Sequence, residues 1–455
     1  MITASRNRSG LFIAAMLLFS GLRAQNQEAK TEFSLQEAID YALAHNQNQR
    51  NAELDVESAK ARNREYTGIG LPQINASGDV KDYLTIPTSL IPAKAFNANA
   101  PADQYIPVKF GTKYNASLGL SLSQILFNTD YLVGLQAAKQ LVVLSEKNVK
   151  RSKVEIHAAI TKAYYGAIII KERLKIIDAN IERIKKLLDD TKAMNASGFA
   201  EKLDVDRVEL TYNNLLSEET KLQRLVELSE LTLKFQMGYN MESPITLTDV
   251  ISADLLIDIE SLSQQKMDYE ARPEYAMLKS QQTINGIELK RNKYQYFPSL
   301  VGYASLTQQA QRTTFNLFDI DQPWYPIRLI GATINIPIFS GGQKYYRIQQ
   351  SKLGLQKTGN SLDFLQRSID VEVASSKVLY KNAFVSLETQ KKNRDLAKSI
   401  YDTSKIKYDT GVGSNLDVIY AQAAYREAEI TFLSAVYDLI IAKTDYLKST
   451  GTLVK

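Results

Sequence analysis

Cysteine is absent from the 455-residue chain, and histidine occurs only twice. The lack of cysteine excludes a disulfide framework, a thiolate metal site, a cysteine nucleophile and a lipid anchor on an N-terminal cysteine. His45 and His157 have no carboxylate or cysteine companions at ligand spacing, so we interpret both as solvated helix positions. A nucleophile elbow, a phosphate-binding loop and a paired-carboxylate signature are also missing. The sequence therefore predicts a protein that is not an enzyme, with no cofactor and no metal site.

Long apolar segments are missing as well. The apolar run at 11–19 has about nine residues, whereas a transmembrane helix needs roughly 20. It follows Arg6 and Arg8 and precedes Gly21-Leu22-Arg23-Ala24, which is the pattern of a secretory signal peptide over residues 1–24. Leu22 in place of a small residue leaves the cleavage position open. Removal of this segment lowers the formal net charge from +5 to about +2, so we expect no nucleic-acid partner.

Very long helices are the main feature of the remaining chain. Residues 33–67 favour helix and contain neither proline nor glycine. A second helical tract runs over about 129–195, which corresponds to roughly 100 Å, and a returning helix follows at about 203–236. In the tract at 129–195, apolar residues alternate steps of four and three, which predicts a left-handed coiled coil. They are Ile156, Ile160, Ala163, Ala167, Ile170, Leu174, Ile177, Ile181, Ile184 and Leu188.

Alternating apolar and polar residues predict a β-hairpin over about 73–124, with a proline-punctuated connection between its two strands. The same order then repeats. A helix at 274–296 leads to a hairpin at about 299–338, a long helix at about 343–409 and a returning helix at about 416–447.

A duplication explains this order. Its clearest trace is the match of Gly198–Val205 to Gly411–Val418, in which the glycine and a Leu-Asp-Val triplet keep one offset. We therefore divide the chain into a first repeat at 25–239, a linking segment at 240–270 and a second repeat at 271–455.

The lengths and number of these parts predict a membrane β-barrel to which one chain contributes only part of the strands. Two short helices placed end to end match one long helix, so each repeat can form a paired rod. Strands of about ten residues suit a tilted β span of a bilayer. Four strands cannot close a barrel, and open edges are not tolerated in hydrocarbon, so several chains would have to pool their strands. The fold class is thus mainly α with a small β part.

The chain resembles the TolC-like outer-membrane efflux proteins. The resemblance rests on the two repeats of helix, hairpin and helix, on Pro72 and Pro298 at the helix-to-strand junctions, and on the two Gly-to-Leu-Asp-Val turns. Ile125-Leu126-Phe127 and Ile338-Phe339-Ser340-Gly341-Gly342 follow the second strand of each hairpin. It implies a homotrimer with one twelve-stranded β-barrel in the outer membrane of a Gram-negative bacterium and a long α-helical barrel in the periplasm. It also implies a periplasmic adaptor and an inner-membrane pump of the RND or ABC type as partners.

The resemblance also assigns roles to residues near the two turns. It implies that the tips dock the adaptor, with Gly198, Phe199, Gly411, Val412, Gly413 and Ser414. It implies a pore gate in which Asp417 forms an acidic ring, Tyr420 replaces a second acid, Gly413 replaces an arginine, and Tyr408 and Asp204 link neighbouring tips. The structural alternatives are helical hairpins that need glycine for the turn and aspartates that cap helix N-termini.

Aromatic residues bracket the predicted strands, which suggests the interfacial belts of a membrane barrel, with buried packing as the alternative. They are Tyr83, Tyr114, Phe127, Tyr303, Trp324, Tyr325 and Phe339.

We interpret the protein as a passive exit duct in the outer membrane, served by the pump and the adaptor. A type I protein-secretion duct of the same fold is one alternative. Others are an exported coiled-coil scaffold or adaptor that never enters a membrane and an enzyme framed by the rods. The substrate stays open, with drugs, metal ions and polypeptides all compatible with a wide aqueous lumen.

Overall fold

The computed structural model describes residues 31–250 and 267–454, except for positions 318 and 320. The predicted signal peptide at 1–24 and residues 251–266 of the linking segment at 240–270 lie outside the described residues. Within the described part of the chain, no helix is both long enough and apolar enough to cross a membrane. The division into two repeats stays a prediction.

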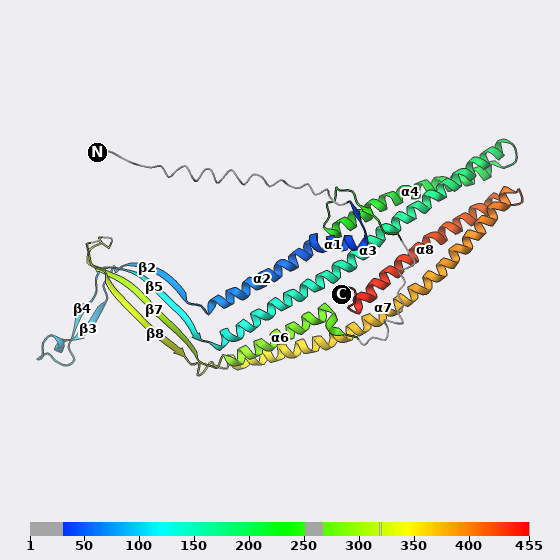
Figure 1. Ribbon diagram of the computed structural model, residues 1–455. Helices are drawn as coiled ribbons and strands as arrows, with labels where there is room; N and C mark the ends of the chain where they lie inside the picture. Colours follow the sequence, from blue (N-terminus) through cyan, green and yellow to red (C-terminus); the bar gives the residue numbers. More distant parts are fainter. Residues whose placement is uncertain (1–30, 251–266, 318, 320, 455) are drawn as a thin grey trace, which may run out of the picture. The chain divides into compact units, whose positions relative to one another are not determined.

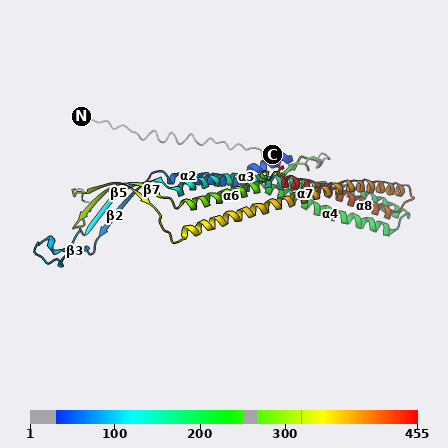
Figure 2. The ribbon, with the colours of Figure 1, turned by 90° about the horizontal axis from the view of Figure 1, so that it is seen from below.

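Four helices form the long rods, and their bounds lie within two residues of the predicted ones. Helix α3 spans Thr129–Ala196 and α4 returns over Lys202–Met237. Helix α7 spans Gln343–Asp409 and α8 returns over Asn415–Ser449. At 1.5 Å per residue, α3 and α7 are each about 100 Å long. Figures 1 and 2 draw α4 alongside α3 and α8 alongside α7.

The predicted single helix at 33–67 is wrong, because the chain forms two helices there. Helix α1 covers Leu35–His45 and α2 covers Gln47–Ile69. Asn46 between them has an extended backbone, and its side-chain amide donates to the carbonyl of Gln236 at 2.7 Å. The break is thus fixed by a contact 190 residues away in the sequence, which the local pattern does not reveal.

A four-stranded antiparallel sheet has the order β2-β5-β7-β8. Its strands are β2 (Gln73–Asp82), β5 (Tyr114–Phe127), β7 (Ser299–Arg312) and β8 (Tyr325–Asn335). Strand β8 ends before Ile336 and Ile338, although the predicted strand included both. Pro337 has no amide to donate to a ladder, which explains the early end.

The register of the sheet separates an apolar face from a polar face, because cross-strand partners share a face. One row joins Ile74, Leu122, Ala304 and Ile330, and the next residue along each strand gives the polar row Asn75, Ser121 and Ser305. Strand β8 departs from this alternation, since Arg328 pairs with Leu306 on the apolar face and Leu329 pairs with Ser305 on the polar face.

The chain divides into two compact units, and α3 and α7 run through both. In the unit that carries the sheet, α2, the start of α3, α6 (Pro273–Tyr294) and the start of α7 lie in this order. The hydroxyl of Tyr131 donates to the Thr67 carbonyl at 3.2 Å and joins α2 to α3. Arg291 of α6 forms two hydrogen bonds with Asp130 of α3, at 2.8 and 2.7 Å. A bond of 2.7 Å from Asn292 to Ser351 joins α6 to α7.

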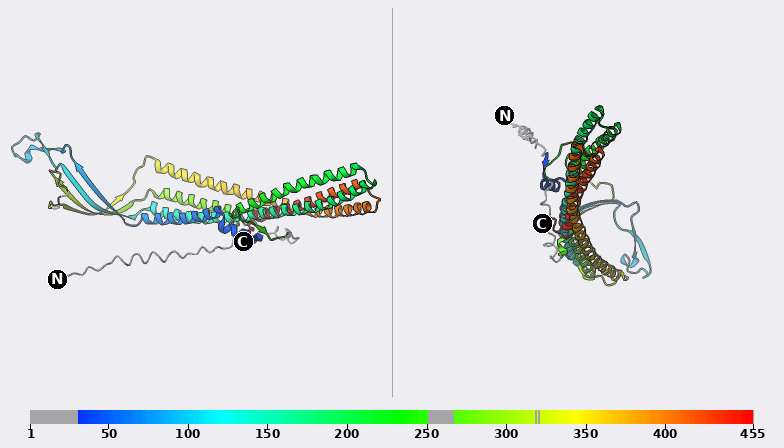
Figure 3. Two further views of the ribbon diagram at one scale, coloured as in Figure 1. Left: turned by 90° about the horizontal axis from the view of Figure 1, so that it is seen from above. Right: turned by 90° about the vertical axis from the view of Figure 1, so that its right-hand side faces the viewer.

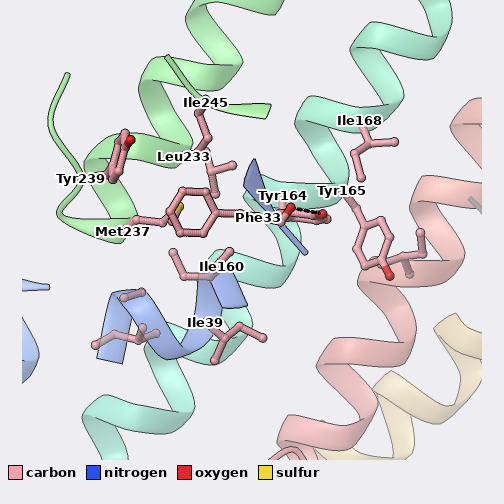
Figure 4. Packing of buried hydrophobic residues seen from close by; sticks show 14 of the residues in the cluster. Phe33, Ile39, Ile160, Tyr164, Tyr165, Ile168, Leu233, Met237, Tyr239 and Ile245 are labelled. Atoms are coloured by element: carbon pink, nitrogen blue, oxygen red, sulfur yellow. Dashed lines mark hydrogen bonds between the residues drawn. The ribbon is translucent and has the colours of Figure 1, made fainter. Parts of the chain in front are cut away.

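The other unit has a compact apolar core where α1, α3 and α4 meet, shown in Figure 4. Phe33 of β1 (Glu32–Phe33) is fully buried beside Ile160 and Met237. The Tyr164 hydroxyl donates to the Phe33 carbonyl at 2.9 Å, which fixes this strand beside β6 (Thr246–Leu247). A capping box at Ser34 then starts α1. This core sets the place from which α3 and α4 extend to their connecting turn.

Two further strands lie between β2 and β5, where the sequence predicts only a connection. Strands β3 (Thr88–Pro92) and β4 (Tyr105–Lys109) form a separate antiparallel hairpin. The short 3-10 helix η1 (Ala93–Ala95) follows β3 directly, and a second one, η3 (Tyr269–Ala271), precedes α6. Figures 1 and 3 show the β3–β4 hairpin projecting away from the four-stranded sheet.

Candidate functional site

Two helical turns with one backbone design join the long helices. In the α3–α4 turn, the amide of Phe199 donates to the Met194 carbonyl at 2.8 Å. In the α7–α8 turn, the amide of Val412 donates to the Lys407 carbonyl at 2.9 Å. Both bonds span five residues and enclose a left-handed glycine, with φ of 79° at Gly198 and 78° at Gly411. This is the Schellman arrangement that ends helices, and it accounts for both glycines.

The residue after each glycine projects into solvent. Phe199 is 86% exposed and Val412 is 84% exposed, so each turn presents a bare apolar side chain. The two turns differ at the following position. A side chain at Gly413 would lie 2.8 Å from the Tyr408 amide nitrogen, whereas the equivalent position of the first turn holds Ala200. Gly413 is therefore required by close backbone packing, and no arginine fits there without a shift.

The candidate gate residues lie at the start of the returning helices. Asp417 lies in the first turn of α8 and is exposed, and Tyr420 is exposed one turn later. Ser414 precedes them, and its hydroxyl accepts the amide of Leu416 at 3.1 Å. Because Ser414 supplies a cap for this helix, Asp417 is left to stabilise the helix dipole or to act in a pore.

Tyr408 and Asp204 have different neighbours within the chain. The Tyr408 hydroxyl lies 3.5 Å from Thr191 Oγ1 and 3.5 Å from Met194 Sδ. Asp204 faces Arg207 at 3.7 Å on its own helix. Both residues thus have partners inside one subunit, and a link between them stays a prediction about neighbouring subunits.

Behind the second turn, α3, α7 and α8 enclose a cavity of about 410 Å³ that Tyr408 lines. The rings of Tyr401 and Tyr425 stack at 6.0 Å, and the Arg183 guanidinium lies 5.9 Å from one ring and 5.6 Å from the other. Burial, with a smaller contribution from Glu429, raises the pKa of Tyr425 to about 12, and burial also raises the pKa of Tyr401. Both phenols therefore stay neutral near pH 7, and Arg183 is held by the ring faces.

A buried polar pair lies beside this cluster and was missed by the sequence analysis. The side-chain amide of Gln422 donates to Asn180 Oδ1 at 2.7 Å, and Asn180 Nδ2 donates to the Ile176 carbonyl at 2.7 Å. Both residues are almost fully buried. Asn180 stands beside the apolar positions Ile177 and Ile181, and such a polar residue in a coiled-coil core signals a register-fixing contact.

Six of the seven predicted belt aromatics lie near the two ends of the four-stranded sheet, and Tyr303 lies on its polar face. Tyr83, Tyr114, Trp324 and Tyr325 lie at the end of the sheet where β2 ends and β8 begins, and Phe127 and Phe339 lie at the opposite strand ends. Tyr303 pairs with Ser123 and Gly331 and so belongs to the polar face. Its ring lies over Gly331.

Metal-ligating and acid–base chemistry find little support in the described ranges. Among those residues, no three histidine or acidic side chains come together as metal ligands would. His45 is exposed and stacks on Tyr41 at 4.0 Å, as expected for a solvated position. His157 differs from the expectation, because it is partly buried and this burial lowers its pKa.

The comparisons with known proteins agree with this architecture. A family model described as "Outer membrane efflux protein" matches residues 287–452. The resemblance of the chain to the TolC-like outer-membrane efflux proteins is thus confirmed over residues 287–452. It is 21% identical to the probable efflux pump outer membrane protein TtgC of Pseudomonas putida, over 92% of this chain and 83% of the relative.

A second relative is the alkaline protease secretion protein AprF of Pseudomonas aeruginosa, which is 20% identical over 73% of this chain and 68% of AprF. The solved structure of CusC has a TM-score of 0.73 at 15% identity and covers 95% of each chain. That likeness shows the fold and confirms the predicted fold class.

Proposed function

We propose that the protein is an exit duct in the outer membrane of a Gram-negative bacterium, formed by several copies of the chain. The observation that carries this proposal is a sheet with one apolar face, one polar face and two open edges, β2 and β8. An open edge cannot stay unpaired in hydrocarbon. Joining β8 of one copy to β2 of the next would close the sheet, with the apolar face towards lipid and the polar face towards a lumen.

The helices support the same assembly. Helix α7 exposes Phe364, Val371, Val378 and Val385 at intervals of seven residues. A heptad stripe of this kind is typical of a helix that packs against a partner helix. We propose a homotrimer, in which α7 of one copy packs on the next copy and the helices continue the duct into the periplasm.

The proposed partners are a periplasmic adaptor protein and an inner-membrane pump of the RND or ABC type. The exposed Phe199 and Val412, which project from otherwise tightly bonded turns, support the proposal that the tips dock the adaptor. Conduction itself would be passive, with no enzymatic step and with energy supplied by the pump. Opening would require the two turns to move apart.

The gate that we propose is an acidic ring of Asp417 from each copy. A ring of like charges attracts cations and raises the pKa of its own members. Tyr420 supplies no second charge, and Gly413 supplies no arginine, so this gate is less charged than a two-acid gate. Tyr408 is held inside its own subunit by Thr191 and Met194, which leaves Asp417 as the main candidate.

Two substrate classes are compatible with these features. TtgC is named as an efflux pump component and AprF as a protease secretion protein, and the chain resembles both to a similar degree. We favour efflux, because the match to TtgC covers more of the chain, and we keep protein secretion as the second candidate.

The test is planar-bilayer conductance of the purified oligomer. We expect discrete channels, and we expect divalent cations added on the tip side to block them. Asp417→Ala should weaken this block several-fold while the oligomer still assembles. Asp206→Ala, which removes an exposed carboxylate from α4 near the other tip, is the matched control.

Unaltered block in Asp417→Ala would remove this residue from the gate. Absence of any conductance, together with free protein in the periplasmic fraction, would favour the scaffold alternative.

A further inference from the structure

The hairpin of β3 and β4 has too little packing of its own to be stable by itself. Each strand has five residues, and the hairpin forms a two-stranded sheet separate from the main one. Isolated two-stranded hairpins are marginal in water and need a further layer against one face. The short helix η1 buries Ala93 but leaves Phe96 exposed. Within the residues that the structure describes, a covering surface for this hairpin is therefore missing from the single chain.

One face of this hairpin is apolar and exposed. In the register Leu90 lies opposite Pro107 and Pro92 lies opposite Tyr105, so these four residues share a face. Leu90 is 67% exposed and Tyr105 is 55% exposed. Thr88 and Lys109 continue the same face towards the main sheet. The other face is less exposed at Ile91 and Val108.

The hairpin is unsuited to pairing with a further strand. Pro92 and Pro107 each remove a backbone donor, one from each strand. A partner would therefore meet the side chains of the exposed face, because the backbone edges are blocked.

The sheet topology indicates which surface comes next to this face. Asp82 at the end of β2 pairs with Tyr114, and Tyr114 pairs with Arg312 at the end of β7. The β3–β4 hairpin and the β7–β8 connection thus leave the same end of the sheet, from opposite sides. If β2 of one copy lies beside β8 of the next, the hairpin of the first copy meets the β7–β8 connection of the second.

The two surfaces are complementary in charge and in side-chain type. Segment 83–113 holds three lysines and one aspartate, whereas segment 313–324 holds two aspartates and no basic residue. Lys109 lies on the exposed face of the hairpin, and Asp319 and Asp321 are exposed in the connection. Phe315 and Trp324 add exposed aromatic surface there. Opposite charges flanking apolar surface favour one defined docking orientation.

We propose that the β3–β4 hairpin is a strap. The face formed by Leu90, Pro92, Tyr105 and Pro107 packs on the β7–β8 connection of the neighbouring copy. The occupant is thus a second copy of this chain, and the strap adds a contact outside the barrel wall at the joint that closes it. This proposal rests on the proposed assembly by joined β2 and β8 edges.

Engineered disulfides test the strap cleanly, because the chain has no cysteine of its own. The variants are Thr88→Cys on the exposed face and Thr314→Cys beside Phe315. Both positions are exposed, and both changes are conservative in size. In membranes containing the double variant, mild oxidation should give covalent dimers and trimers on non-reducing gels. Co-expression of the two single variants should give covalent dimers only. Ser89→Cys, on the opposite face of the hairpin, replaces Thr88→Cys as the matched control and should lose most of the cross-linked product.

The native mass of the same samples distinguishes a failure of the strap from a failure of the proposed oligomeric duct. A trimer without covalent dimers, or with a disulfide closed inside one chain, would overturn the strap and leave the proposed duct intact. A native monomer would overturn both.

Discussion

Helices α3 and α7 have almost the same length but opposite surroundings. In α3, Ile160 and Ile177 are fully buried and Ile184 is 1% exposed. In α7, the heptad residues from Phe364 to Val385 are 57–74% exposed. Contacts explain the difference. Helix α3 is joined to α2 and α6 in one unit, and to α4 and α8 in the other through Lys171–Glu230 and Gln422–Asn180.

Two helices of almost equal length thus occupy different places in the chain. Helix α3 lies inside the subunit, and α7 lies at its edge. The strands follow the same rule, since β5 and β7 are central and β2 and β8 are edges. A subunit with one apolar helix stripe and two strand edges left open is an incomplete wall, and identical copies can complete it.

The largest expected effect is on assembly. Glutamates at Val378 and Val385 would place charge on the exposed stripe of α7, so we expect Val378→Glu/Val385→Glu to yield folded monomers and no trimer. Native mass and circular dichroism measure the two properties. Lys391→Glu changes an exposed position about 120° around the same helix and should still assemble. A trimer that survives the double change would refute the assignment of α7 as an interface.

The next effect compares the contributions of α3 and α7 to the free energy of unfolding of one subunit. Ile160→Ala should lower the free energy of unfolding of the subunit by about 2–5 kcal/mol, because it opens a cavity in the core. Val371→Ala, at another exposed position of the α7 stripe, should change it by less than about 0.5 kcal/mol in the monomeric Val378→Glu/Val385→Glu variant. Urea unfolding followed by circular dichroism compares the two. Equal losses would mean that α7 is as buried as α3 within one chain.

The two turns provide a smaller test. Gly198→Ala and Gly411→Ala should each cost about 1–2 kcal/mol locally, since both glycines are left-handed and a methyl group would meet open space. Equal costs are expected because the turns share one hydrogen-bond pattern. Hydrogen exchange of the turn amides measures the loss, and clearly unequal values would show that the turns are not equivalent.

The smallest effect concerns the Asp130–Arg291 pair between α3 and α6. Its hydrogen bonds to Arg291 hold the pKa of Asp130 below the ordinary 3.8, so the folded state binds this proton less readily than the unfolded state. The stabilisation is complete above the unfolded value and is lost as the pH falls through the folded value. Both side chains are partly exposed, so screening limits the pair to about 0.5 kcal/mol.

Asp130→Asn should flatten the fall in stability below about pH 4, measured as the melting temperature against pH. A profile identical to that of the unchanged protein would contradict the role of this pair.

Periodic sequence patterns predicted the long helices and the alternating strands, because the burial of one face is recorded in local spacing. The break at Asn46 was not predicted, since it depends on a contact with Gln236. The β3–β4 hairpin was also missed, because prolines marked the segment as a connection and its short strands show no clear alternation. Among the candidate tip residues, the glycines Gly198 and Gly411 follow from the backbone geometry of the turns. The roles of Asp417, Tyr408 and Asp204 depend on neighbouring copies and stay predictions.

If one chain forms an incomplete wall, the native mass of the detergent-extracted protein should show several chains together. We predict a single species with the mass of three mature chains, and loss of that species in Val378→Glu/Val385→Glu. A stable, folded species with the mass of one chain in the unchanged protein would contradict the claim.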